Sequence, residues 1–274
     1  MKVVLADSML AAPANQMFGE DKTVATLDAW IGVLAFSGQI FFDFAGYSTC
    51  AIGVALCLGF VLPQNFNYPY AAIGFSDFWR RWHITLSAWL RDYLYIPLGG
   101  NQNGKVKTYI NLMLTMLIGG LWHGANWTFV VWGGLHGFYL WIEKFVDDKT
   151  GKIKAMAASA NNTITHFLYA LFTFFLVNIT WVFFRANTFT KAANIFKSMF
   201  GWHKGEPLLT TIAIIKVVVI IFIMIIVQWL MRNTKVLDAA HKIPWWLLGI
   251  VWAVLLLLLI WSQESSSSFI YFQF

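Results

Sequence analysis

The sequence has few charged residues for its length. Only 12% of its 274 side chains are Asp, Glu, Lys or Arg, whereas 59% are hydrophobic. Soluble domains usually carry about 25% charged residues, so most of the surface of this chain is not expected to face water. This deficit argues against a soluble globular protein and favours one that is embedded in a lipid bilayer.

Cysteine is also scarce. Cys50 and Cys57 are the two cysteines, and they lie seven residues apart in an apolar stretch. That spacing places both on one face of a helix, and it forms neither a CxxC pattern nor a disulfide framework. We therefore expect two reduced thiols that serve as small, buried packing residues.

Several signatures of soluble enzymes are missing. The sequence contains no GxxxxGK[ST] loop, no GxGxxG after a strand, no GxSxG elbow and no HExxH helix. Nucleotide, serine-nucleophile and metal sites are therefore not expected. The Lys and Arg residues are dispersed among loops, as suits anionic lipid headgroups, and they form no block that would indicate nucleic-acid binding. Any chemistry would have to rest on imidazole and a substrate hydroxyl.

The chain does have long apolar stretches, and crossing a bilayer takes about 20 residues. The first stretch is long enough for two passes, is interrupted by Asp43, Gly46 and Tyr47, and stops at Pro63. Two others are short, and we expect them to be tilted, re-entrant or buried against other helices. The pattern predicts an all-α, polytopic transmembrane protein. The six stretches cover about 27–62, 109–122, 127–142, 166–184, 212–231 and 245–261.

The segment Phe75–Tyr95, FSDFWRRWHITLSAWLRDYLY, is of another kind, too polar to span a membrane and too aromatic for a soluble loop. At 100° per residue, one narrow stripe collects Arg80, His83, Ser87 and Arg91. The opposite arc is apolar. This predicts one amphipathic helix that lies in the membrane interface. The apolar residues are Phe78, Trp79, Trp82, Leu86, Trp89 and Leu90.

His123 is the first candidate for chemistry, in Gly-Gly-Leu-Trp-His-Gly-Ala-Asn-Trp at the end of an apolar stretch. Ionisable groups at membrane depth are costly and usually face a cavity or a partner. Because imidazole titrates near pH 6.5, His123 could act as a general base. It could equally be a histidine that is hydrogen-bonded between helices, and the residues alone leave both interpretations open.

Four further residues carry similar alternatives. His83 could line a substrate passage or face lipid headgroups, and His136, in Gly-Gly-Leu-His-Gly, could serve helix packing or chemistry. Asp43 lies within an apolar run and needs a partner, for which we expect an arginine or a tyrosine hydroxyl; a structural hub is favoured over direct catalysis. Asn126 could orient His123 or cap the next helix.

Four motifs together resemble one known family. FDFAGYS, FWRRWHITLSAWLRDYLYIPLGGN, GGLWHGANWTFVVWGGLHG and the terminal FIYFQF are similar to the membrane-bound O-acyltransferases of bacterial polysaccharide modification, in particular the alginate O-acetyltransferase branch. The resemblance runs over residues 2–274 and is most specific between Asn65 and Gly137, which points to a catalytic segment at about 65–145. It implies transfer of an acetyl group from acetyl-CoA towards an extracytoplasmic glycan at the bacterial inner membrane. The implied partners are an SGNH-type periplasmic or surface acetyltransferase and the polysaccharide biosynthesis machinery.

The resemblance also implies roles for individual residues. The family's catalytic histidine falls on His123 in Leu-Trp-His-Gly, and its second functional histidine falls on His83 in Arg-Trp-His-Ile. His123 would take a proton from the acceptor hydroxyl, which then attacks the thioester, while His83 would orient the acyl group or stabilise charge. The expected supporting or substrate-binding residues are Arg80, Arg91, Asp43, Asn126 and His136.

Family members are usually longer, so we expect residues 1–274 to be the C-terminal portion of the family's domain, with several N-terminal spans absent or supplied by another chain. Three alternatives remain. One is D-alanyl transfer to teichoic acid from a carrier protein, and another is a non-catalytic subunit of polysaccharide export. A small transporter is disfavoured, because Asp43 is the one clear carboxylate in the middle of an apolar stretch.

Overall fold

The computed structural model describes residues 1–159, 163–202, 205–234, 236, 238 and 242–262. These residues form helices joined by loops, with one isolated bridge between Val24 and Glu206. The expectation of an all-α protein is confirmed, while the FIYFQF motif at 269–274 lies outside the described residues. The helices of the described ranges are η1 (Lys2–Leu10), α1 (Ala11–Gly19), α2 (Thr26–Cys57), η2 (Pro69–Ala71), α3 (Phe75–Trp79), α4 (Ile84–Leu90), η3 (Arg91–Tyr95), α5 (Gly104–Trp122), α6 (Trp127–Thr150), α7 (Lys152–Ala158), α8 (Ile164–Arg185), α9 (Phe189–Met199), α10 (Thr211–Met231) and α12 (Trp245–Trp261).

Three helices among the described residues are long and apolar enough to cross a membrane: α2, α8 and α10. At a rise of about 1.5 Å per residue, the 22 residues of α8 extend over about 33 Å, close to the thickness of a bilayer's hydrocarbon core. The expectation of a polytopic helical membrane protein is therefore confirmed. The apolar helix α12 has 17 residues.

The expected interruption of the stretch 27–62 is wrong, because α2 is one continuous helix of 32 residues that runs through Asp43 and Gly46. The stretch, although long enough for two passes, is therefore not divided into two helices at that point. Asp43 does not interrupt it, since Nζ of Lys2 lies 2.6 Å from the carboxylate and supplies the charge partner. The cation beside Asp43 is thus a lysine, where the sequence led us to expect an arginine or a tyrosine hydroxyl as the partner. Cys50 and Cys57 are free, as expected, but both are exposed on the last turns of α2 instead of buried.

The chain divides into two compact units, residues 1–61 with 197–274, and residues 62–196. In the first unit, α2 packs against η1, α1 and α10. Asp28, in the first turn of α2, accepts hydrogen bonds from the backbone N–H groups of Leu208 and Leu209, at 2.5 and 3.3 Å. Residues distant in sequence are thereby tied to the start of a membrane helix.

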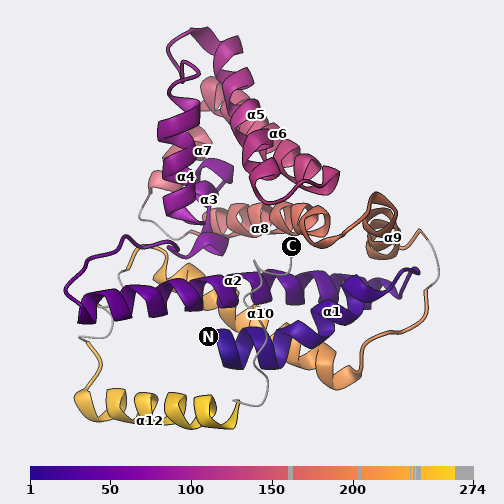
Figure 1. Ribbon diagram of the computed structural model, residues 1–274, viewed down its shortest axis with the longest axis vertical. Helices are drawn as coiled ribbons and strands as arrows, with labels where there is room; N and C mark the ends of the chain where they lie inside the picture. The colour runs from indigo at the N-terminus through magenta and orange to yellow at the C-terminus, as the bar shows by residue number, and fades with distance from the viewer. Residues whose placement is uncertain (160–162, 203–204, 235, 237, 239–241, 263–274) are drawn as a thin grey trace. The chain divides into compact units, whose positions relative to one another are not determined.

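In the second unit, α5 and α6 lie side by side and antiparallel (Figure 1). Their contact depends on glycines. A Cβ atom on Gly133 would lie 2.2 Å from the carbonyl oxygen of Met116, and one on Gly120 would lie 2.3 Å from that of Phe129. No side chain fits at such distances, so the two backbones touch directly, as small residues allow in membrane proteins. The tight turn after α5 carries His123.

The expected amphipathic helix over Phe75–Tyr95 is also wrong. The segment consists of α3, a break, α4 and the π-helical turn η3. His83 ends the break in the left-handed region, with φ +43°, which cannot continue a right-handed helix. Asn65 takes over the local hydrogen bonds, because its backbone oxygen accepts from the N–H of Ile84 and its side chain accepts from Thr85. The stripe of Arg80, His83, Ser87 and Arg91 therefore does not exist.

Candidate active site

His123 directly follows the last residue of α5, where its backbone N–H donates to the carbonyl of Gly120 at 3.0 Å. Its ring lies edge-on against Trp132 and Phe184, each at 5.1 Å between ring centroids. Burial in this aromatic surround, with a smaller contribution from the nearby charge of His83, lowers the pKa of His123 to about 3. At neutral pH the imidazole is therefore uncharged, which is the form that can accept a proton.

His83 is held by the side chain of Asn65, whose Oδ1 lies 3.2 Å from the ring Nδ1. The same Oδ1 accepts from the backbone N–H of Thr85, which can only donate, so this atom is the amide oxygen. His83 consequently donates through Nδ1 and keeps Nε2 as an unprotonated nitrogen. Burial lowers the pKa of His83 to about 4. Its ring lies 6.5 Å from that of Trp122, the residue before His123.

His136 lies on α6 and is completely buried. Its Nε2 lies 3.0 Å from Oγ1 of Thr180 on α8. The ring of Trp132 lies 4.9 Å from that of His136 and 5.1 Å from that of His123, so one indole touches both histidines. The structure thus brings the three predicted histidines, His83, His123 and His136, into one compact unit among aromatic rings.

The two predicted arginines lie apart from this histidine cluster. Arg80 is exposed, and its Nε donates to the carbonyl of Ser76 at 3.0 Å. Arg91 forms a bidentate ion pair with Asp92 on the protein surface, with Nε 2.7 Å from Oδ1 and Nη2 3.1 Å from Oδ2. Their side chains border two different pockets, and the lining of neither pocket includes His83.

The last two predicted residues have structural partners. Asn126 caps α6, because its Oδ1 accepts from the N–H of Thr128 at 3.1 Å, and its Nδ2 donates to the carbonyl of Asn187 at 3.0 Å. Of the two alternatives for Asn126, the structure bears out the cap. Asp43 belongs to the other compact unit and pairs there with Lys2.

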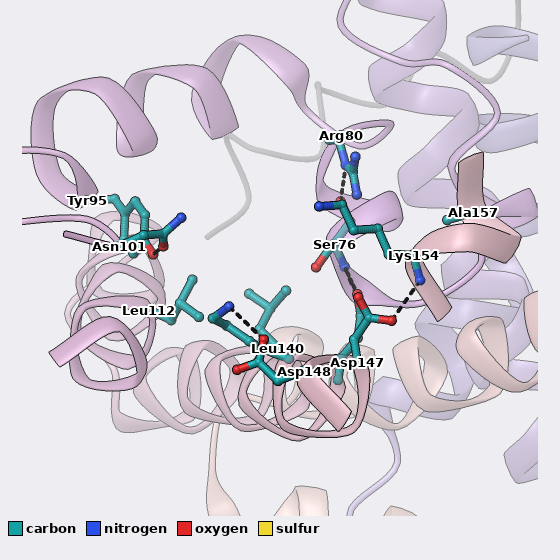
Figure 2. A pocket seen from close by; sticks show the side chains of 12 residues that line it. Ser76, Arg80, Tyr95, Asn101, Leu112, Leu140, Asp147, Asp148, Lys154 and Ala157 are labelled. Atoms are coloured by element: carbon teal, nitrogen blue, oxygen red, sulfur yellow. Dashed lines mark hydrogen bonds and ion pairs between the residues drawn. The ribbon is translucent and has the colours of Figure 1, made fainter. Parts of the chain in front are cut away.

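Two adjoining pockets lie within residues 62–196. The larger pocket has a volume of about 290 Å³, and its lining carries charges of both signs. Arg80 and Lys154 lie on one side of it, and the uncharged Tyr95 and Asn101 lie on the other (Figure 2). The smaller, about 210 Å³, is apolar and is bordered by Trp79. Both are lined by Tyr95, Leu112 and Leu140. Because the ring of Trp79 also lies 5.0 Å from that of His136, this indole connects the apolar pocket with the histidine cluster.

Three residues of this unit were not singled out from the sequence. Asn65 orients His83, Thr180 binds His136, and Glu143 accepts from the backbone N–H groups of Phe75 and Ser76 at the start of α3. Asn65 could have been noticed, because it begins the segment in which the family resemblance is most specific. Thr180 and Glu143 carry no local signal, since their partners are 44 and 68 residues away. Within the described ranges, no group of three His, Cys, Asp or Glu side chains is arranged to hold a metal ion.

Comparison with known proteins gives one family and several relatives. A profile of the membrane-bound O-acyltransferase family matches residues 21–186. A probable alginate O-acetylase, AlgI, of Pseudomonas aeruginosa is 47% identical over 208 residues, which cover 75% of this chain and 38% of that protein. A peptidoglycan O-acetyltransferase of Helicobacter pylori is 45% identical over 200 residues, covering 73% of this chain and 36% of that protein. A teichoic acid D-alanyltransferase of Bacillus subtilis is 32% identical over 136 residues, covering 47% and 34%. The chain thus spans less than two fifths of the length of these relatives.

Proposed function

Because this chain belongs to the membrane-bound O-acyltransferase family, as its motifs suggested, we propose that it transfers an acetyl group towards an extracytoplasmic polysaccharide. The carrying observation is its likeness to relatives that are named for acetyl transfer to alginate or peptidoglycan, at 47% and 45% identity. The relative named for D-alanyl transfer is 32% identical. This difference favours acetyl as the transferred group and an alginate-like or cell-wall glycan as the acceptor.

In the proposed reaction His123 is the general base. Its neutral imidazole takes the proton of the acceptor hydroxyl as the hydroxyl oxygen attacks the thioester carbonyl. The new C–O bond forms, the C–S bond breaks, and the departing thiolate takes the proton back from His123. A charged imidazolium is poorly solvated among Trp132 and Phe184, so it is stabilised mainly by the negative charge that develops on the carbonyl oxygen. His83, oriented by Asn65, would position the acyl group.

We propose acetyl-CoA as the donor. Its phosphates need cations, and its pantetheine arm and acetyl group need a less polar passage. The charged pocket offers Arg80 and Lys154 (Figure 2), as well as Lys144. The apolar pocket that adjoins it is bordered by Trp79. Arg91, at the border of the apolar pocket, would add a further cation.

The proposed setting is the bacterial inner membrane, with several membrane passes. It is supported by the family and by the apolar helices α2, α8 and α10. As the partner we propose an SGNH-type acetyltransferase at the periplasmic or outer surface, which receives the acetyl group and works with the polysaccharide biosynthesis machinery.

The test is a His123→Ala variant in the protein as the cell makes it. We expect the variant to remain in the membrane and glycan acetylation to be abolished, because the base is removed. A His166→Ala variant, in the first turn of α8, is the matched control and should acetylate normally. Unchanged acetylation in His123→Ala would refute the assignment and favour a non-catalytic export subunit. Supplying a D-alanyl carrier protein in place of acetyl-CoA in a reconstituted assay separates the two donors.

A further inference from the structure

The proton on the ring of His136 can be placed from its surroundings. The hydroxyl of Thr180 lies 2.7 Å from the carbonyl oxygen of Val177 and 3.0 Å from Nε2 of His136. A hydroxyl has one hydrogen, and the carbonyl can only accept, so Thr180 donates to Val177. It therefore accepts from His136, which makes Nε2 the protonated nitrogen and Nδ1 the one with a free lone pair.

That Nδ1 is buried, and no group in the described part of the chain hydrogen-bonds to it. The same holds for the indole N–H groups of Trp79 and Trp132. The three rings are mutual neighbours, with centroids 4.9 to 5.9 Å apart in every pair. One acceptor and two donors, all buried, thus gather beside His123. Leaving each of them unsatisfied would carry the full desolvation penalty of a buried polar group.

The chemistry of these three groups selects what can satisfy them. A carbonyl oxygen could accept from the indoles but has nothing to offer Nδ1, and an ammonium could donate to Nδ1 but not accept from an indole. A hydroxyl does both. An N–H directed at the face of a neighbouring ring could satisfy an indole weakly, but it would leave the lone pair of His136 without a donor.

We propose that His136 Nδ1, together with the indole N–H groups of Trp79 and Trp132, binds a hydroxyl group. The hydroxyl donates to Nδ1 and accepts from an indole. It belongs either to a buried water or to the acceptor glycan, and Trp79 gives access to it from the apolar pocket. The second source rests on the proposed function, whereas the first does not. His136 is then a positioning residue for the reaction and not its base.

Two substitutions of His136 separate this proposal from a purely structural role. His136→Asn keeps a polar amide near the position of Nδ1 and loses the contact with Thr180. His136→Gln keeps a donor near the position of Nε2 for Thr180 and loses the acceptor at Nδ1. If the ring binds a hydroxyl through Nδ1, Asn is the milder change. If the ring only braces Thr180, Gln is the milder change.

The experiment measures thermal unfolding of the purified, membrane-reconstituted protein, and the kcat and KM of acetyl transfer to the glycan. We expect His136→Gln to unfold several degrees below His136→Asn. If the hydroxyl belongs to a buried water, the difference in unfolding temperature should appear with and without glycan, and the KM for the acceptor glycan should be unchanged. If the hydroxyl belongs to the acceptor glycan, the KM for the acceptor should rise about tenfold or more in His136→Gln. Equal effects of the two variants, or a milder effect of Gln, would overturn the proposal.

Two further variants keep the test decisive if both His136 variants fail to fold. Trp79→Phe retains an aromatic ring but removes the indole N–H together with part of the ring volume, and it should lower the unfolding temperature or raise the acceptor KM more than the same truncation does elsewhere. Trp82→Phe, the same truncation at a side chain that is 2% exposed, is the matched control. Equal behaviour of these two variants would overturn the proposal. If the wild-type protein transfers no acetyl group, the proposed function fails, while the order of unfolding temperatures still decides whether the hydroxyl site exists.

Discussion

The side-chain oxygen of Asn65 lies 3.2 Å from Nδ1 of His83 and 3.0 Å from Oγ1 of Thr85. One oxygen therefore fixes both the tautomer of a candidate active-site histidine and the first turn of the helix that follows it. The backbone of His83 lies in the left-handed region, which is unfavourable for residues with a Cβ. The contact with Asn65 helps to offset that cost.

Asn65→Ala removes this anchor. We expect a loss of about 1–3 kcal/mol of unfolding free energy, because the Nδ1–H of His83 and the hydroxyl of Thr85 lose a part-buried acceptor. Acetyl transfer should fall by at least about tenfold, because the ring of His83 is free to turn. Denaturation and transfer assays on the same preparation check both effects. Gln102→Ala, at an exposed residue of the same unit, should change neither. A fully active Asn65→Ala protein would refute the role given to His83.

The pH dependence of acetyl transfer tests the electrostatics of the site. Protonation disables a general base, and burial lowers the pKa of His123 to about 3. Activity should therefore stay level between about pH 8 and pH 5, where an exposed histidine would already be half protonated near pH 6.5. The measurement is kcat/KM across this range, with the stability of the protein monitored at each pH. An acidic limb centred at or above pH 6.5 would contradict the assignment of His123 as the base.

The contact of α5 with α6 can be tested with adjacent glycines. Gly133→Ala would force a Cβ to within 2.2 Å of the carbonyl oxygen of Met116, so the helices must separate. We expect a loss of about 1–3 kcal/mol of unfolding free energy and reduced transfer, because the turn that carries His123 shifts. Gly134→Ala meets only Leu117, at 3.5 Å, and should be neutral or stabilising by up to about 1 kcal/mol. Unfolding in detergent compares the pair, and indistinguishable variants would argue against direct backbone contact.

The ion pair between Lys2 and Asp43 predicts a large effect on stability. Asp43 is only 2% exposed, so Lys2→Met would leave its carboxylate buried without its closest cation. Breaking a buried pair from one side costs about 3–5 kcal/mol. Replacing both partners, in Lys2→Met with Asp43→Leu, should recover much of that loss. Thermal unfolding of the single and double variants measures the coupling, with Asp21→Asn on the exposed surface as the control. Additive effects would mean that the two charges are not coupled.

The parts of the fold that sequence predicted best are those that depend on composition alone. Trp245–Trp261 is an unbroken apolar run and Ile212–Met231 is apolar apart from Lys216 and Gln228, and the helices α12 and α10 match them to within a residue. Where a carboxylate entered an apolar stretch, the outcome depended on a partner elsewhere. Asp43 looked like an interruption, yet Lys2, which lies 41 residues earlier in the chain, neutralises it and α2 continues.

The candidate site shows the same limit. The helical-wheel prediction for Phe75–Tyr95 assumed one continuous helix. The helix is broken at His83, whose backbone is left-handed and whose side chain is hydrogen-bonded to Asn65. His136 could not be assigned from its flanking glycines, because its environment is set by Thr180 on another helix and by Trp79 and Trp132. The motifs contain the three histidines that the structure brings together, while the contacts that orient them are long-range.

The length of α2 has a consequence for the bilayer around it. Its 32 residues extend over about 48 Å, whereas a hydrocarbon core is about 30 Å thick and the 21 residues of α10 span about 32 Å. The end of α2 is apolar as well as exposed, at Val54 and Leu56, so projecting it into water would be unfavourable. Strong inclination relieves this hydrophobic mismatch. Of these spans, α2 is therefore the one whose tilt should follow the chain length of the surrounding lipids.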